Sequence, residues 1–190
     1  MKNIAKLILI FIAVSFVHLS GSSAYAKVNF NSSQQSPLEE DPAKALYNRG
    51  TAHYEAGEFD AAIQDLSAAL AMEPAAPDAY YNRGMAYREK KMIDEAIADY
   101  TKALELAPSQ PGYYLNRCNA FIVKEDYESA INDCTKAIEL APQEPKSYFL
   151  RGLARMFKGD NAGAVADADK ALEINPNYAD ALKLKKEAAA

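Results

Sequence analysis

Residues 80–108 read YYNRGMAYREKKMIDEAIADYTKALELAP, and the pattern of this stretch recurs both before and after it. Proline marks the period most clearly, because the segments ALAMEP, ALELAP, AIELAP and ALEINP end 34 residues apart, at Pro74, Pro108, Pro142 and Pro176. The front half keeps the same phase, as YNRG, YNRG, LNRC and FLRG. A fixed period of this length indicates a repeat architecture.

Each period predicts two helices. Apolar and small residues recur at spacings of three and four, which is the pattern of an amphipathic helix. In the second unit we expect helices over about 77–90 and 93–106, the first opening near a proline. With this 34-residue unit of helix, turn and helix, the chain resembles the tetratricopeptide repeat family. The resemblance implies an all-α, right-handed superhelical solenoid of four repeats (42–74, 75–108, 109–142 and 143–176) and a capping helix over 177–190.

The turns inside the repeats differ between outer and inner units. Gly57 and Gly159 occupy the outer turns, whereas Lys91 and Glu125 occupy the inner ones. If this position requires a positive φ, the two residues that are not glycine are strained.

The first 26 residues read as a secretory signal peptide. They begin with a basic segment that carries Lys2 and Lys6, continue as an apolar run and end in the small-residue segment AYA. A membrane anchor is the alternative, but a spanning helix needs about 20 apolar residues and this run is shorter. We therefore predict cleavage after Ala26 and a periplasmic or secreted product without a membrane anchor.

Residues 27–41, KVNFNSSQQSPLEED, are polar and lack apolar periodicity, which predicts a flexible leader. A short docking peptide anchored by Phe30 and Leu38 is the alternative. Loss of the two lysines of the signal would change the net charge from −5 to −7. This acidic balance argues against nucleic acid and against an anionic membrane surface as partners.

Arginine and aspartate recur at fixed positions of the repeat and could form a regular series of ion pairs, called the ladder below. An arginine occupies one position of every repeat, and an aspartate follows it sixteen residues later. Each aspartate could pair with the arginine of its own repeat or with that of the next. Either pairing predicts a structural ladder in preference to an anion-binding groove. Its members are Arg49, Arg83, Arg117 and Arg151, with Asp65, Asp99, Asp133 and Asp167.

Cys118 and Cys134 are the only cysteines of the chain, and each lies eight residues from the turn near Asp126. They therefore face each other across one helical pair. In an oxidising compartment they could form a disulfide that stabilises the fold by roughly 3 kcal/mol. The alternative is two small buried side chains, and a CxxC redox or zinc motif is absent from the sequence.

The repeats offer no catalytic chemistry. His53 is the only histidine after the predicted cleavage, and we expect a packed ring because Tyr87 and Phe121 hold the same position in the next units. A metal cluster, a nucleophile with a base or a phosphate loop cannot be assembled from these residues. We predict neither an enzyme nor a bound cofactor or metal.

The family resemblance implies a concave groove lined by the first helix of each repeat. Three aligned asparagines are expected to hydrogen-bond the backbone of an extended peptide, and the C-terminal end of the groove is apolar. The residues carried over are Tyr47, Asn48, Thr51, Tyr54, Tyr81, Asn82, Met85, Arg88, Leu115, Asn116, Asn119, Ile122, Phe149, Leu150, Leu153 and Met156.

Family members that grip the acidic tails of cytosolic heat-shock chaperones use a clamp of lysines, asparagines and an arginine. The matching positions here hold Tyr47, Thr51, Asn82, Gly112 and Asn116, so the clamp is absent. We predict a non-catalytic adaptor that binds a peptide or exposed helix of an envelope protein. A structural subunit that acts through self-association is the alternative.

Overall fold

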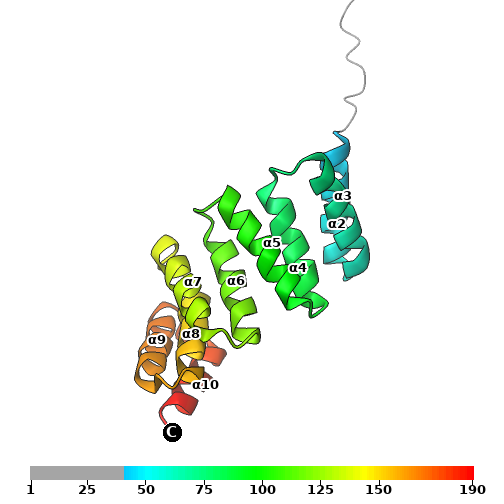
Figure 1. Cartoon of the computed structure of the whole chain (residues 1–190). Coiled ribbons are helices and arrows are strands. Elements are labelled where there is room, and N and C mark those ends of the chain that lie inside the picture. The colour runs from blue at the N-terminus through cyan, green and yellow to red at the C-terminus, as the bar shows by residue number, and fades with distance from the viewer. Residues whose placement is uncertain (1–40) are drawn as a thin grey trace, which may run out of the picture. The chain divides into compact units, whose positions relative to one another are not determined.

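A computed structural model describes residues 41–190; the predicted signal peptide and the leader up to residue 40 lie outside the described residues. Within 41–190 the chain forms α-helices and no strands, which confirms the predicted all-α repeat fold (Figure 1). The helices are α2 (Pro42–Glu55), α3 (Phe59–Met72), α4 (Pro77–Glu89), α5 (Ile93–Leu106), α6 (Pro111–Val123), α7 (Tyr127–Leu140), α8 (Pro145–Phe157), α9 (Asn161–Ile174) and α10 (Ala179–Ala188).

Local sequence sets the helix ends. The first helix of each repeat begins at a proline, where the missing N–H has no intrahelical partner to lose. All four inner turns place one residue at positive φ: 78° at Gly57, 64° at Lys91, 65° at Glu125 and 90° at Gly159. Lys91 and Glu125 therefore adopt the left-handed conformation that the sequence identified as strained.

Small residues let the two helices of a repeat approach closely. At Gly84 the helices are too close for a side chain, because a Cβ built on it would lie 2.8 Å from the ring of Tyr100 and 3.3 Å from the carbonyl of Ala96. The recurring alanines of the second helices are fully or almost fully buried, and larger side chains there would overpack the contact. They are Ala62, Ala96, Ala130 and Ala164, followed by Ala69, Ala103, Ala137 and Ala171.

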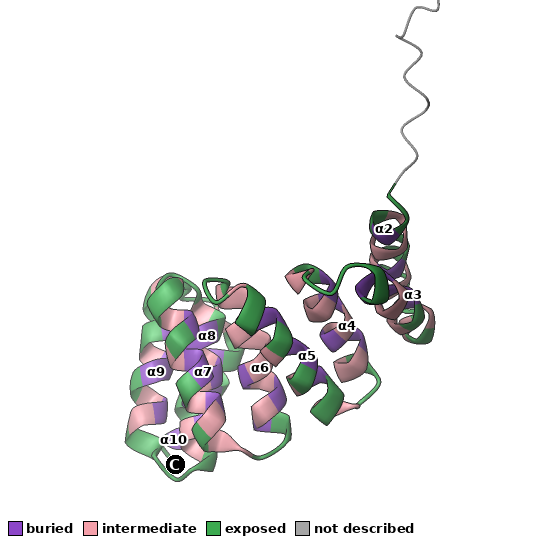
Figure 2. Cartoon of the chain, turned by 45° about the horizontal axis from the view of Figure 1, so that its top comes forward, coloured by how far each residue is buried: buried purple, intermediate pink, exposed green. Residues whose placement is uncertain are grey.

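The helices stack in chain order, and buried residues lie on the faces that neighbouring helices share (Figure 2). The first helices also touch one another, because α2 contacts α4, α4 contacts α6 and α6 contacts α8. Between the second helices of successive repeats, from α3 to α9, the structure has no such contact. The first helices therefore form the tighter, inner row of the curved stack, and the second helices form the outer row.

Helix α10 covers the C-terminal end of the stack. It packs against both α8 and α9 through Ala181, Leu184 and Ala188, which are buried, while Leu182 stays exposed. From residue 41 to the C-terminus, no helix has the length and apolar character to cross a membrane.

Candidate functional site

The arginine and aspartate ladder runs within each repeat, so each aspartate pairs with the arginine of its own helical pair. In the third repeat, Arg117 Nε lies 2.7 Å from Asp133 Oδ2, and Arg117 Nη2 lies 2.8 Å from Oδ1 of the same carboxylate. Two parallel charge-assisted hydrogen bonds of this kind are among the strongest in proteins. The other pairs are Arg49 with Asp65, Arg83 with Asp99, and Arg151 with Asp167.

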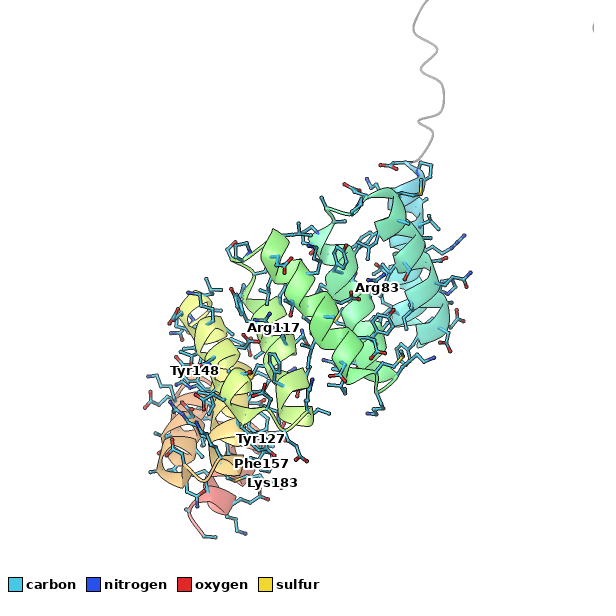
Figure 3. The ribbon with its side chains drawn as sticks, in the orientation of Figure 1. Arg83, Arg117, Tyr127, Tyr148, Phe157 and Lys183 are labelled. Atoms are coloured by element: carbon cyan, nitrogen blue, oxygen red, sulfur yellow. A yellow bond between two sulfur atoms is a disulfide. The ribbon has the colours of Figure 1, made fainter. Side chains whose placement is uncertain are left out.

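The same guanidinium groups also connect successive repeats. Arg117 Nη1 donates to Thr101 Oγ1 at 3.0 Å, and Arg83 Nη1 donates to Ser67 Oγ at 3.0 Å, each acceptor lying in the preceding repeat. Both arginines are labelled in Figure 3, one on α4 and one on α6. The hydrogen bond to Asp99 raises the pKa of Arg83. These donors therefore serve the scaffold, and the ladder is not an anion-binding groove.

A second ladder of lysines joins the repeats at their inner turns, and the sequence interpretation missed it. Lys124 Nζ lies 2.6 Å from Asp94 Oδ1 of the preceding repeat. Lys90 with Asp60 and Lys158 with Glu128 form the same contact. The 34-residue recurrence of these lysines could have revealed them. Because these pairs are exposed to solvent, each contributes little to stability.

Cys118 and Cys134 are joined by a disulfide between α6 and α7, with their Cα atoms 5.6 Å apart. Both side chains are fully buried. Of the two arrangements that the sequence left open, the structure has the bridge.

His53 is more than the packed ring that the sequence predicts. Its ring is half-buried, its Nδ1 lies 2.5 Å from Glu58 Oε2, and its Nε2 lies 3.6 Å from Asp65 Oδ2. In the last repeat Arg155 takes the same position and reaches Asp167 at 2.8 Å. The outer repeats therefore place a basic group beside the ladder carboxylate. Over residues 41–190, no group of three His, Cys, Asp or Glu side chains is arranged to hold a metal ion.

The inner row of first helices provides the candidate groove, but two residues carried over to it lie in the core. Leu150 is 4% exposed and Ile122 is 8% exposed, and both belong to the buried cluster around Cys118. The expectation that they face the groove was wrong, because α6 and α8 pack closely enough to bury this face between them. Most of the other carried-over residues are half-buried: Tyr47, Thr51, Tyr54, Tyr81, Met85, Arg88, Leu115, Asn116, Asn119, Phe149, Leu153 and Met156.

The aligned asparagines mainly join the first helices to one another. Asn82 Nδ2 donates to Tyr47 Oη at 3.2 Å and to Thr51 Oγ1 at 3.1 Å. Asn116 Nδ2 donates to the Tyr81 hydroxyl at 2.6 Å. Both amides are therefore engaged with the preceding repeat, and the expected contact with a peptide backbone is corrected for these two positions. Asn48, in the first repeat, is exposed.

Asn116 has a further contact, since its Oδ1 accepts from Arg88 Nη1 at 2.8 Å. Nearby, the hydroxyl of Tyr100 is fully buried and has no hydrogen-bond partner in the described part of the chain. Burial raises the pKa of Tyr100, so its hydroxyl stays neutral. Tyr100 is therefore a buried, neutral ring that packs against the alanines of this repeat junction.

The C-terminal end of the inner row is hollowed where α8 meets α10. The hollow has a volume of about 210 Å³, and the half-buried side chains of Phe149 and Leu153 provide its apolar surface. Asp180, Lys183, Leu184 and Glu187 of α10 complete it; Lys183 is labelled in Figure 3.

Lys183 belongs to α10, the helix that the sequence predicts as a cap. The 34-residue period places it at the register of Phe149, and that signal could have identified it.

Over residues 47–111 and 115–179 the chain matches the family model for the tetratricopeptide repeat. The TPR domain of OM64 from Arabidopsis is 30% identical, with a TM-score of 0.58 over 59% of this chain and 93% of that one. The first TPR domain of Spaghetti (RPAP3), solved with the HSP90 peptide SRMEEVD, is 28% identical, with a TM-score of 0.58 over 60% of this chain and 90% of that one.

A bacterial structure covers more of the chain at lower identity. MamA from Desulfovibrio magneticus RS-1 is 20% identical, with a TM-score of 0.71 over 78% of this chain and 90% of that one, which shows a shared fold. No curated protein matches the chain.

Proposed function

Because the chain belongs to the tetratricopeptide repeat family, we propose that it is a non-catalytic adaptor that binds a peptide or exposed helix of another protein along its inner row of helices. One observation carries this proposal: apolar side chains that the fold could have buried, Phe149 and Leu153, line an open hollow at the end of that row. An accessible apolar surface of this kind marks an interaction site more often than a catalytic one.

Relatives of the chain support peptide binding as the activity. The first TPR domain of Spaghetti (RPAP3) holds the HSP90 peptide SRMEEVD, and the second TPR domain of human RPAP3, 26% identical to this chain, holds the HSP70 peptide SGPTIEEVD. Both peptides end in an acidic tail. The positions that would clamp such a tail here include Tyr47, Thr51 and Gly112 and no lysine, which favours a different class of partner.

The C-terminal hollow indicates what that partner presents. An apolar side chain fits against Phe149 and Leu153, while the mixed charges of Asp180, Lys183 and Glu187 suit a polar flank. Two or three buried apolar anchors contribute about 1.5 to 3 kcal/mol each. After the cost of ordering a peptide is subtracted, the affinity is micromolar at best, equivalent to ~8 kcal/mol. Binding is therefore transient.

We place the partner in the envelope of a bacterial cell. The signal-like pattern of the first 26 residues supports export. The disulfide between Cys118 and Cys134 supports the same location, because such bonds persist in oxidising compartments and are rare in the cytosol.

The experiment is chemical crosslinking in intact envelopes, comparing the wild type with Leu153→Asp and Leu182→Asp. Leu182 is the matched control, because it is exposed on α10 and does not line the hollow. We expect one distinct protein to be captured by the wild type and by Leu182→Asp but lost with Leu153→Asp, while circular dichroism stays unchanged in all three. Equal capture by both variants would exclude the hollow as the binding site.

A further inference from the structure

A second hollow lies at the opposite end of the repeats, where α2, α3 and the start of α4 meet. Its volume is about 240 Å³, and its lining includes Tyr47, Ala69, Ala76 and Ala79. This volume exceeds the roughly 30 Å³ of one water molecule and falls below the roughly 300 to 1,000 Å³ of small-molecule sites. The hollow therefore has the size for one large side chain.

The next junction between repeats shows which kind of side chain fits. Tyr113 occupies the position that Ala79 holds one repeat earlier, and it is 5% exposed. Its ring stacks on Tyr81 with the centroids 4.6 Å apart, and its hydroxyl donates to Asp78. An aromatic ring thus fills the space in the second junction that is open in the first.

At the last junction, between the fourth repeat and α10, a ring also fills this space, but it comes from another sequence position. Tyr178 packs edge-on against Phe149, with the ring centroids 5.6 Å apart. It stands where the first junction has Ala76, and Phe149 stands where the first junction has Tyr47. The first junction therefore carries alanine at both positions from which the second and the last junction supply a ring, whereas the third junction has Glu144 and Ser147 there.

Tyr47 is already held in position to stack against such a ring. Asn82 donates to the Tyr47 hydroxyl, as Asn116 donates to the Tyr81 hydroxyl, so equivalent amides hold the two tyrosines. A ring that enters the first hollow can stack on Tyr47 as Tyr113 stacks on Tyr81. Such aromatic pairs contribute binding beyond their buried area.

The charges around the hollow indicate which charge the ligand carries beside its ring. Three carboxylates line it, those of Asp41, Glu73 and Asp78, against the single cation of Lys44. Asp41 also accepts a hydrogen bond from the backbone N–H of Ala43, which leaves its charge in place. At the equivalent position of the second junction Glu73 is replaced by Ala107, so the excess of negative charge is specific to the open hollow.

The geometry points to a socket for a tyrosine or phenylalanine side chain of the partner, with a lysine or arginine beside it in the partner's sequence. This inference rests on the proposed function and extends it, because it names a chemical class for the partner segment at the α2 end. The partner then meets an aromatic socket at this end and the apolar hollow of α8 and α10 at the other.

The test is an NMR titration of the full chain with L-tyrosinamide, whose ammonium group stands next to its ring. We expect saturable shifts at Tyr47, Ala69 and Ala79. L-leucinamide lacks the ring and the neutral N-acetyl-L-tyrosinamide lacks the cation, and each should bind more weakly by roughly fivefold, the effect of one exposed charge pair or one lost ring contact.

Substitutions that fill the socket from within should abolish these shifts. Ala76→Tyr copies Tyr178, and Ala79→Tyr copies Tyr113, so one variant still tests the inference if the other fails to fold. Ala71→Tyr is the matched control, since Ala71 is exposed on α3 and does not line the hollow. The control should keep the wild-type shifts.

Three results would overturn the inference: absence of saturable shifts, equal binding of L-leucinamide, or unchanged binding in the filled variants. A second copy as the occupant would appear as dimerisation in sedimentation that Ala76→Tyr abolishes, which also contradicts a peptide ligand. The titration needs no partner protein. Failure here with capture still lost in Leu153→Asp would leave the adaptor function standing. Saturable shifts here with equal capture by both variants would exclude the hollow of α8 and α10 and leave the socket.

Discussion

Replacing both Cys118 and Cys134 by alanine should lower the free energy of unfolding by about 3 to 4 kcal/mol. The bridge joins residues 16 apart in the chain, and closing a loop of that length stabilises the folded state by about 3 kcal/mol in the chain-entropy model. Both side chains are fully buried, so loss of the two sulfur atoms adds up to roughly 1 kcal/mol. In a domain of this size each kcal/mol shifts the melting temperature by about 2 to 4 °C.

The assay is thermal unfolding followed by circular dichroism, with and without a reductant. The wild type should melt about 6 to 12 °C lower once its bridge is reduced. The double alanine variant should melt at one temperature in both buffers, which makes it the control for effects of the reductant itself. An unchanged melting temperature for wild-type protein whose thiols are shown to be free would refute the reasoning.

Three further predictions concern the scaffold. Arg117→Ala should cost about 3 kcal/mol in urea unfolding, because its side chain is 18% exposed and its removal leaves a buried carboxylate, whereas Arg49→Ala should cost less, because Arg49 is 63% exposed and His53 lies 3.6 Å from its partner Asp65. Tyr100→Phe should raise stability by about 1 kcal/mol, since it deletes a buried hydroxyl without a partner in the described chain; a loss of stability would reveal a hidden partner. Gly84→Ala should cost about 1 to 3 kcal/mol by overpacking, while Gly112→Ala, whose nearest neighbour is 3.9 Å away, should be tolerated in the same assay.

The repeat architecture was predictable because every 34-residue unit carries the same helix, turn and helix pattern. Proline positions alone located the first helices, and the structure begins α4 and α6 at Pro77 and Pro111. The facing of Cys118 and Cys134 also followed from counting residues away from the turn. Both deductions use distance along a helical hairpin, which the local sequence determines.

The candidate groove was less predictable, because it depends on how closely successive first helices approach. Leu150 and Asn82 share one repeat position and were both expected in the groove. In the structure one is core and the other hydrogen-bonds Tyr47 of the preceding repeat. A side chain at this position contacts the first helix of a neighbouring repeat and is shielded from solvent. The sequence of a single repeat does not show how close that neighbouring helix lies.

The two hollows depend on differences between repeats. Ala79 and Tyr113 occupy one position, so the pattern reads both as packed residues, yet one junction is filled and the other is open. The pattern of a family describes what the repeats share. The two hollows proposed as binding sites lie at positions where the repeats depart from that pattern.

The central claim, that a partner binds the inner row, is tested most directly by site-specific photocrosslinking in intact envelopes. A photoreactive amino acid would be placed at Met85 or Leu153 on the inner row, and at Lys102 or Lys136, exposed on the outer helices, as matched controls. We predict that one partner is captured from both inner positions and from neither outer position. Capture from the outer positions alone, or of the chain's own copies alone from every position, would contradict the account.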